Sequence, residues 1–99
     1  MAEALPVAAA RQRLDRWLFF SRAVKSRTLA QRLIESGVVR VNGERTSRTD
    51  RQVGAGDVLT MTLGSRLCVW RIRDPGSRRG PAPEAAALYD DLTPEMPRT

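Results

Sequence analysis

The chain has 99 residues, of which 41% are apolar, and it carries a net charge of +6 at pH 7. This length suits one modest domain and leaves no room for a catalytic domain beside a binding domain. Because there is one cysteine and no histidine, we expect no intrachain disulfide, no imidazole base, no metal site and no cofactor. No apolar run is long enough to span a bilayer, so we expect a soluble, cytoplasmic protein without a membrane partner.

Positive charge is concentrated in the N-terminal half of the chain. Residues 11–51 hold eleven arginines or lysines against four acidic residues, whereas residues 80–99 hold one arginine against four acidic residues. Such a field attracts polyanions, with nucleic acid as the first candidate and anionic lipid as the second.

The first helix is predicted over residues 13–21, after a flexible N-terminal tail over residues 1–10. Four residues recur at the spacing of one helical face and should be buried. They are Leu14, Trp17, Leu18 and Ser21. Arg13 and Arg16 lie off this face and should point to solvent.

The second helix is predicted to begin at Ser26, a suitable N-cap, and to end before Gly37, which suits a left-handed C-terminal position. Its apolar face should consist of Leu29, Ala30, Leu33 and Ile34. Arg27, Gln31 and Arg32 fall on its polar side.

Two hairpins are predicted after Gly37. Asn42-Gly43 is a strong signal for the first hairpin, and Gly64-Ser65 suits a type II′ turn in the second. With that second turn, Leu59 pairs with Trp70 and Met61 pairs with Cys68, which places these apolar residues on one face. Trp17, Trp70 and Cys68 are therefore predicted to lie in the core.

The C-terminal part is predicted to contribute little to the fold. Residues 74–83 are rich in proline, glycine and charge, which predicts a linker at which core contacts end. A short helix is predicted from Pro83 through residues 84–92, before Pro94 stops it. We expect the tail over residues 80–99 to be dispensable for folding.

The start of the second helix also predicts a phosphate site. Arg22, Lys25 and Arg27 place cations at a helix N-terminus, where the helix dipole disfavours them. Since Ser26 would leave the backbone N–H groups of Arg27 and Thr28 free, an anion such as RNA backbone would stabilise this arrangement. The alternative is a solvated charge run without a ligand.

The motifs RLDRWL, RAVKSR, LAQRLIESGVVRVNG and VGAGDVLTM resemble, in this order, the RNA-binding domain first described in ribosomal protein S-four. The resemblance covers residues 11–73, and residues 74–99 form the linker and acidic tail. It implies an α+β fold, the alpha-L RNA-binding motif, in which two short N-terminal helices pack on a small bent antiparallel sheet of about four strands. A short C-terminal helix follows.

Within that family, RLDRWLFFSRAVKSR and RRGPAPEAAALYDD resemble the heat-shock-protein-fifteen subgroup. This implies a noncatalytic factor that binds structured RNA, with the ribosomal RNA of the large subunit as its partner, in ribosome rescue or the stress response. Separately, we expect a monomer. DNA binding should be weaker. The predicted RNA-binding residues are Arg13, Arg16, Arg22, Lys25, Ser26, Arg27, Thr28, Arg32, Arg45 and Arg48.

Two other functions remain open on the sequence alone. One is a detached accessory module of an RNA-modifying enzyme, although no paired carboxylates and no glycine-rich phosphate loop support it. The other is a DNA-binding helix-turn-helix protein, for which Arg27 alone offers little base readout. Phe19 and Phe20 could stack on bases or contact the tail, and the sequence does not decide between these roles.

Overall fold

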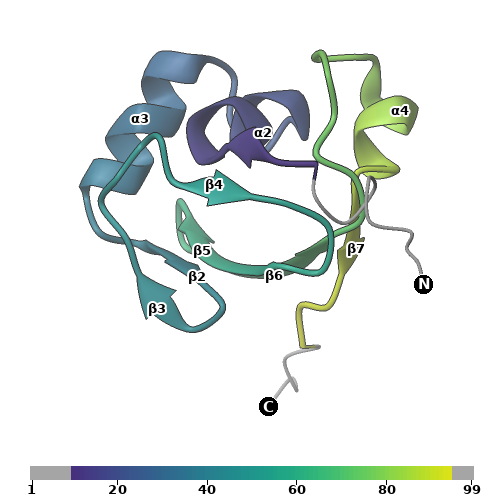
Figure 1. Ribbon diagram of the computed structural model, residues 1–99. Helices are drawn as coiled ribbons and strands as arrows, with labels where there is room; N and C mark the ends of the chain where they lie inside the picture. The colour runs from purple at the N-terminus through teal and green to yellow at the C-terminus, as the bar shows by residue number, and fades with distance from the viewer. Residues whose placement is uncertain (1–9, 95–99) are drawn as a thin grey trace, which may run out of the picture.

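A computed structural model describes residues 10–94, so the N-terminal tail predicted over residues 1–10 lies almost wholly outside the described residues. The helices are α2 (Leu14–Phe20), α3 (Arg27–Glu35) and α4 (Ala82–Ala86). The strands are β1 (Gln12–Arg13), β2 (Val39–Val41), β3 (Glu44–Arg45), β4 (Gln52–Val53), β5 (Val58–Leu63), β6 (Arg66–Ile72) and β7 (Tyr89–Asp91). Figure 1 shows two layers, with the helices on one side of a curved sheet. The predicted α+β class, with helices packed on an antiparallel sheet, is confirmed.

The two N-terminal helices form where the apolar spacing predicts them, and they bury the predicted faces. Leu14, Trp17 and Leu18 of α2 are fully buried, as are Ala30 and Ile34 of α3. Leu29 is the exception, since it lies in the first turn of α3 and is 44% exposed. Gly37 has a φ of 86° and ends α3 in the left-handed conformation expected there.

The main sheet is antiparallel, with the strand order β3-β2-β5-β6-β7. The predicted register of the second hairpin is confirmed, because Leu59 lies opposite Trp70 and Met61 lies opposite Cys68. These four residues are buried beneath the helices. A separate pair of short strands, β1 and β4, ties the start of α2 to the chain that precedes β5.

The first hairpin turns at Asn42 and Gly43, which both have positive φ angles, of 52° and 88°. This is the type I′ geometry that the Asn-Gly dipeptide favours. The Asn42 amide also holds the neighbouring loop: its Oδ1 accepts from the Val58 N–H at 2.9 Å, and its Nδ2 donates to Asp57 Oδ1 at 3.1 Å. The turn therefore fixes the entry to β5.

The C-terminal part differs from the sequence prediction, because core contacts continue well beyond Arg73. The predicted helix ends at Ala86, and the following Tyr89–Asp91 forms β7, which pairs with β6 at the sheet edge. The expectation that core contacts end at a linker is wrong. Local sequence favours a helix here, but pairing with β6 satisfies the backbone of residues 89–91 in a way that no local pattern reveals.

Aromatic stacking explains why this segment docks. The Tyr89 ring stacks on Trp70 with centroids 3.8 Å apart, and Trp17 meets both rings edge-on at 6.2 Å. Trp17 Nε1 donates to the carbonyl of Asp74 at 3.0 Å, which satisfies the polar atom of a fully buried side chain. The C-terminal segment thus completes the core around both tryptophans, whose predicted burial is confirmed.

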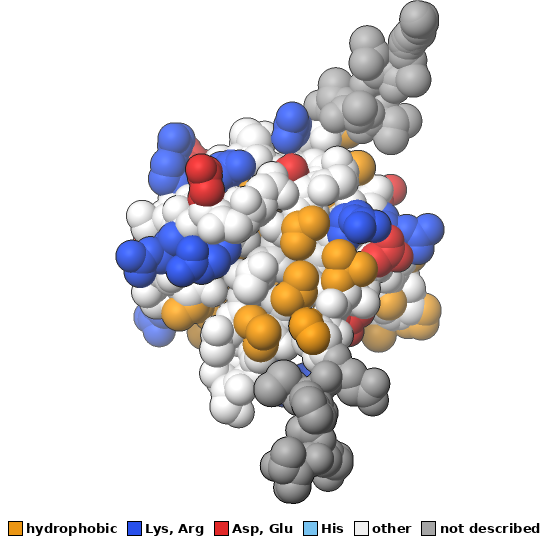
Figure 2. All heavy atoms as spheres, turned by 90° about the horizontal axis from the view of Figure 1, so that it is seen from below, with side chains coloured by type: hydrophobic (Ala, Val, Ile, Leu, Met, Phe, Trp, Pro, Cys, Tyr) orange, Lys and Arg blue, Asp and Glu red, His pale blue; other side chains and the backbone are white. Residues whose placement is uncertain are grey.

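Figure 2 shows the face of the sheet that lies away from the helices, where apolar side chains gather between cations. Leu67 of β6 and Leu92 beyond β7 are 49% and 39% exposed. Among residues 10–94, no helix is long and apolar enough to cross a membrane.

Candidate nucleic-acid interface

The turn between α2 and α3 prepares the N-terminus of α3 as the sequence predicts. Ser26 is the N-cap, and its hydroxyl accepts from the Leu29 N–H at 3.1 Å. The Ser26 carbonyl accepts from the Ala30 N–H at 3.0 Å. Since the first N–H groups of a helix have no partner within it, those of Arg27 and Thr28 remain available to a ligand.

Replacement of Ser26 by alanine should lower the free energy of unfolding by about 1 kcal/mol, because the Leu29 N–H loses its acceptor at the helix start. Urea unfolding measures this loss. Ser47→Ala is the matched control, since Ser47 is exposed and lies in no helix. Equal unfolding midpoints for the two variants would contradict the capping role.

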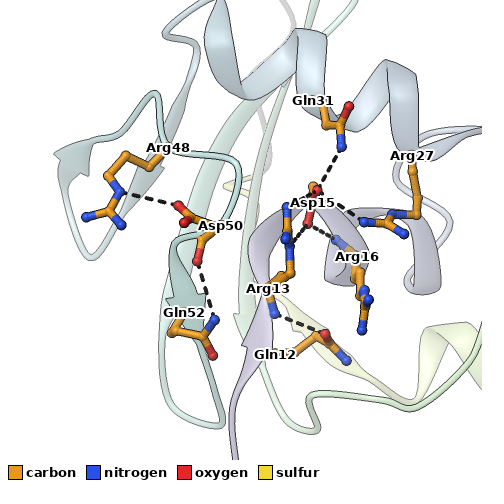
Figure 3. A network of polar contacts seen from close by, with 9 residues as sticks. All are labelled: Gln12, Arg13, Asp15, Arg16, Arg27, Gln31, Arg48, Asp50 and Gln52. Carbon is orange, nitrogen blue, oxygen red and sulfur yellow. Dashed lines mark hydrogen bonds and ion pairs between the residues drawn. The ribbon is translucent and has the colours of Figure 1, made fainter.

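Two of the predicted cations, Arg13 and Arg27, meet at a carboxylate that the sequence analysis did not single out. Asp15 is fully buried. Arg13 donates to it from Nε and Nη2, both at 3.0 Å, and Arg27 Nη2 lies 3.5 Å from its Oδ2 (Figure 3). Gln31 Nε2 donates to the same Oδ2 at 3.0 Å, and the Arg16 N–H donates to Oδ1 at 2.8 Å.

This network decides the charge state of Asp15. Burial by itself would raise the pKa of the carboxyl group, but the hydrogen bonds from Arg13 and Gln31 and the charge of Arg13 outweigh it and lower the pKa. Asp15 is therefore ionised at neutral pH. The same contacts raise the pKa of Arg13.

Other predicted cations are exposed around the two helices. Lys25 and Arg32 line a shallow groove with Leu29 and Leu33, so the turn and α3 share one surface there. Arg16 and Thr28 are also exposed. Within the described part of the chain, Arg16, Lys25 and Arg32 have no carboxylate within ion-pair distance, so they can contact phosphates without breaking an internal ion pair.

The remaining predicted residues lie in other environments. Arg22 has a φ of 65°, and its Nε donates to the Gly80 carbonyl at 2.8 Å, which directs it toward the C-terminal segment. Arg45 lies on β3 beside Gly37, at the opposite end of α3 from Ser26. Arg48 pairs with the exposed carboxylate of Asp50 at 3.3 Å.

Phe19 and Phe20 both contact the C-terminal segment. The Arg79 guanidinium lies 4.8 Å above the Phe19 ring, and its Nε donates to the Phe19 carbonyl at 3.1 Å. Phe20 lies next to Gly76, where an added Cβ would be 3.4 Å from Phe20 Cδ2. Both contacts are with the predicted linker and not with residues 80–99, and stacking of either ring on a base stays an open prediction.

The described residues contain no group of three or more histidine, cysteine, aspartate or glutamate residues placed to hold a metal ion. The features at the helices are instead exposed cations, a capped helix start and a buried carboxylate that binds arginines. Such a surface favours contact with a polyanion.

Comparisons with known proteins identify the class. A family model described as the S4 domain matches residues 12–59, which lie within the residues 11–73 that resemble the S-four domain. The RQC P-site tRNA stabilizing factor of Bacillus subtilis is 34% identical over 86 residues, which cover 84% of this chain and 94% of that protein. Heat shock protein 15 of Escherichia coli strain K12 is 38% identical over 79 residues, which cover 80% of this chain and 59% of that protein.

A solved structure is also similar. The Heat Shock Protein 15 of Vibrio cholerae, described as trimeric, has a TM-score of 0.79 and 34% identity, covering 84% of this chain and 83% of that chain. The chain spans about three fifths of the length of the Escherichia coli relative. For this chain the monomeric state stays a prediction.

The fold and the exposed cations of the helices define an α+β domain with a basic surface. The chain belongs to the S4 domain family, with relatives named Heat shock protein 15 and RQC P-site tRNA stabilizing factor. The resemblance predicted from the sequence is confirmed.

Proposed function

We propose that this protein is a noncatalytic factor that binds structured ribosomal RNA of the large subunit in ribosome rescue or the stress response. The observation that supports this most is the set of exposed cations on α2, on α3 and in the turn between them. Of these, Arg16, Lys25 and Arg32 have no carboxylate partner among the described residues. Rigid helices that present such cations suit the phosphates of a folded RNA, since an A-form helix hides its base edges in a deep major groove.

Transfer RNA at the ribosome is a second candidate ligand. One relative, of which 94% of the length is matched by this chain, is named a P-site tRNA stabilizing factor. The same cations could contact a transfer RNA, because phosphate contacts carry no sequence information. The two candidates therefore differ in the RNA and share the surface.

A competition experiment tests the proposal. A labelled fragment of large-subunit ribosomal RNA is bound to the protein at one salt concentration and is competed with unlabelled ribosomal RNA, transfer RNA and duplex DNA of equal length. We expect the preferred RNA to compete at least about tenfold better than DNA, because the surface is proposed to fit A-form geometry. Equal or better competition by DNA would favour the helix-turn-helix alternative.

Nucleoside analysis of the RNA after incubation tests the noncatalytic part of the proposal. We expect no modified nucleoside above the level in RNA incubated without protein. A new modified nucleoside would show that the protein is an enzyme or that it acts with one.

A further inference from the structure

The buried carboxylate of Asp15 lies beneath two arginines that remain accessible. Asp15 is fully buried, whereas the side chains of Arg13 and Arg27 are 37% and 42% exposed. Burial of a carboxylate is costly, and an apolar residue of similar size often stabilises a core at least as well. The fold alone therefore gives a weak reason for an acid at this position.

The contacts of Asp15 join two elements that are separate in the sequence. Arg13 lies at the start of α2 and offers two parallel N–H donors, both 3.0 Å from the carboxylate oxygens. Arg27 and Gln31 come from the first and second turns of α3, and Figure 3 shows both side chains directed at Asp15. Because Arg13 Nη2 and Arg27 Nη2 contact the same oxygen, at 3.0 and 3.5 Å, the two guanidinium groups lie within reach of one phosphate.

We propose that Asp15 is a positioning residue that holds Arg13 and Arg27 side by side as one preformed phosphate-binding pair. This inference rests on the RNA-binding function proposed above. A free arginine side chain loses rotamer entropy when it binds, whereas a guanidinium that is already fixed loses less. Gln31 supports the pair indirectly, because its hydrogen bond fixes the carboxylate from α3.

Positioning and net charge predict effects of opposite sign. Asp15 is an anion beneath a surface that binds an anion, so its neutralisation raises the net positive charge by one. If only the field mattered, RNA affinity would rise. If Asp15 positions the arginines, affinity falls despite the added charge.

The test compares Asp15→Asn with Asp50→Asn, which makes the same change of charge at an exposed carboxylate paired with Arg48. The asparagine is isosteric with aspartate but loses the charge that holds both guanidinium groups. RNA affinity should fall about tenfold for Asp15→Asn, because charge-assisted contacts are the strong ones. It should stay level or rise for Asp50→Asn. Unchanged or tighter RNA binding by Asp15→Asn would overturn the inference.

A double-mutant cycle separates positioning from general damage to the fold. Asp15→Asn is added to a variant in which Arg13 and Arg27 are both glutamine. If Asp15 acts through these arginines, its replacement no longer weakens binding in that background. A full further loss there would indicate a purely structural role and would also overturn the inference.

Gln31→Ala is a second variant, and it keeps every charge of the protein. It tests the positioning role of Asp15 if Asp15→Asn does not fold. It removes one hydrogen bond from the carboxylate, so we expect RNA affinity about threefold weaker with the fold retained, as judged by circular dichroism. Unchanged affinity would overturn the inference. RNA binding by the unaltered protein is measured in the same assay and keeps the two proposals apart. If the unaltered protein does not bind RNA, the RNA-binding function itself is refuted.

Discussion

Replacement of Arg16, Lys25 and Arg32 together by glutamine is expected to flatten the salt dependence of RNA binding by about two to three units in the slope of log K against log salt. Each lost phosphate contact removes about 0.7 to 0.9 of a released counterion. The three side chains are exposed, so the fold should be retained. Fluorescence anisotropy over a series of salt concentrations measures the slope.

The matched control replaces Arg66, Arg71 and Arg73, which are exposed on or next to β6 in the sheet. This triple variant loses the same charge at a surface that the proposed interface does not include. It should flatten the slope much less, because these residues act only through the general field. Equal slopes for the two triple variants would show that net charge, and not a positioned surface, accounts for binding.

Truncation after Arg79 is expected to destabilise the domain by at least about 3 kcal/mol, which reverses the expectation from the sequence. It removes β7 and with it the Tyr89 ring stacked on Trp70, together with the buried Ala85. It also removes the Leu88 carbonyl, which accepts from the N–H groups of Arg73 and Asp74. For a domain of this size the thermal midpoint should fall by about 12 °C or more.

Two substitutions in the full-length chain accompany the truncation. Tyr89→Ala removes only the stacked ring and should give part of the loss, whereas Leu92→Ala, at a side chain that is 39% exposed, should give little. Differential scanning calorimetry compares the midpoints. A truncated protein that unfolds at the same temperature as the full chain would mean that the docked segment contributes nothing to stability.

The elements that the sequence predicts correctly are those fixed by local rules. Ser26 caps α3 with its own hydroxyl, and Asn42-Gly43 closes a hairpin with φ angles that few other dipeptides adopt. The register of β5 and β6 follows from the two-residue turn at Gly64, because one slip would place Leu59 and Met61 on the solvent face.

The features that the sequence does not predict depend on contacts between distant residues. β7 follows an alanine-rich segment that favours a helix, and only pairing with β6 and stacking on Trp70 make residues 89–91 a strand. β1 and β4 have two residues each, too few to show a period.

The candidate site is predictable only in part, because some of its features follow local rules and others depend on contacts between distant residues. The cations of the turn and the capped start of α3 can be read from the sequence, and the exposure of Lys25 and Arg32 agrees with that reading. The position of Asp15 cannot be read in this way, because its partners Arg27 and Gln31 come from another helix. An acid one residue before Arg16, off the apolar stripe, gives no local sign of burial.

The turn at Asn42 also sets a limit on the chemical lifetime of the protein. Glycine follows this asparagine, and without a Cβ it leaves its backbone nitrogen unhindered for attack on the side-chain carbonyl carbon. That attack expels ammonia and forms a cyclic imide, which water then opens to aspartate or isoaspartate. The new carboxylate would face Asp57, whose Oδ1 now accepts from Asn42 Nδ2 at 3.1 Å, and the two negative charges would repel. Both amide atoms are engaged in the native hairpin, so the rate of this reaction should scale with the fraction of time that the turn is open.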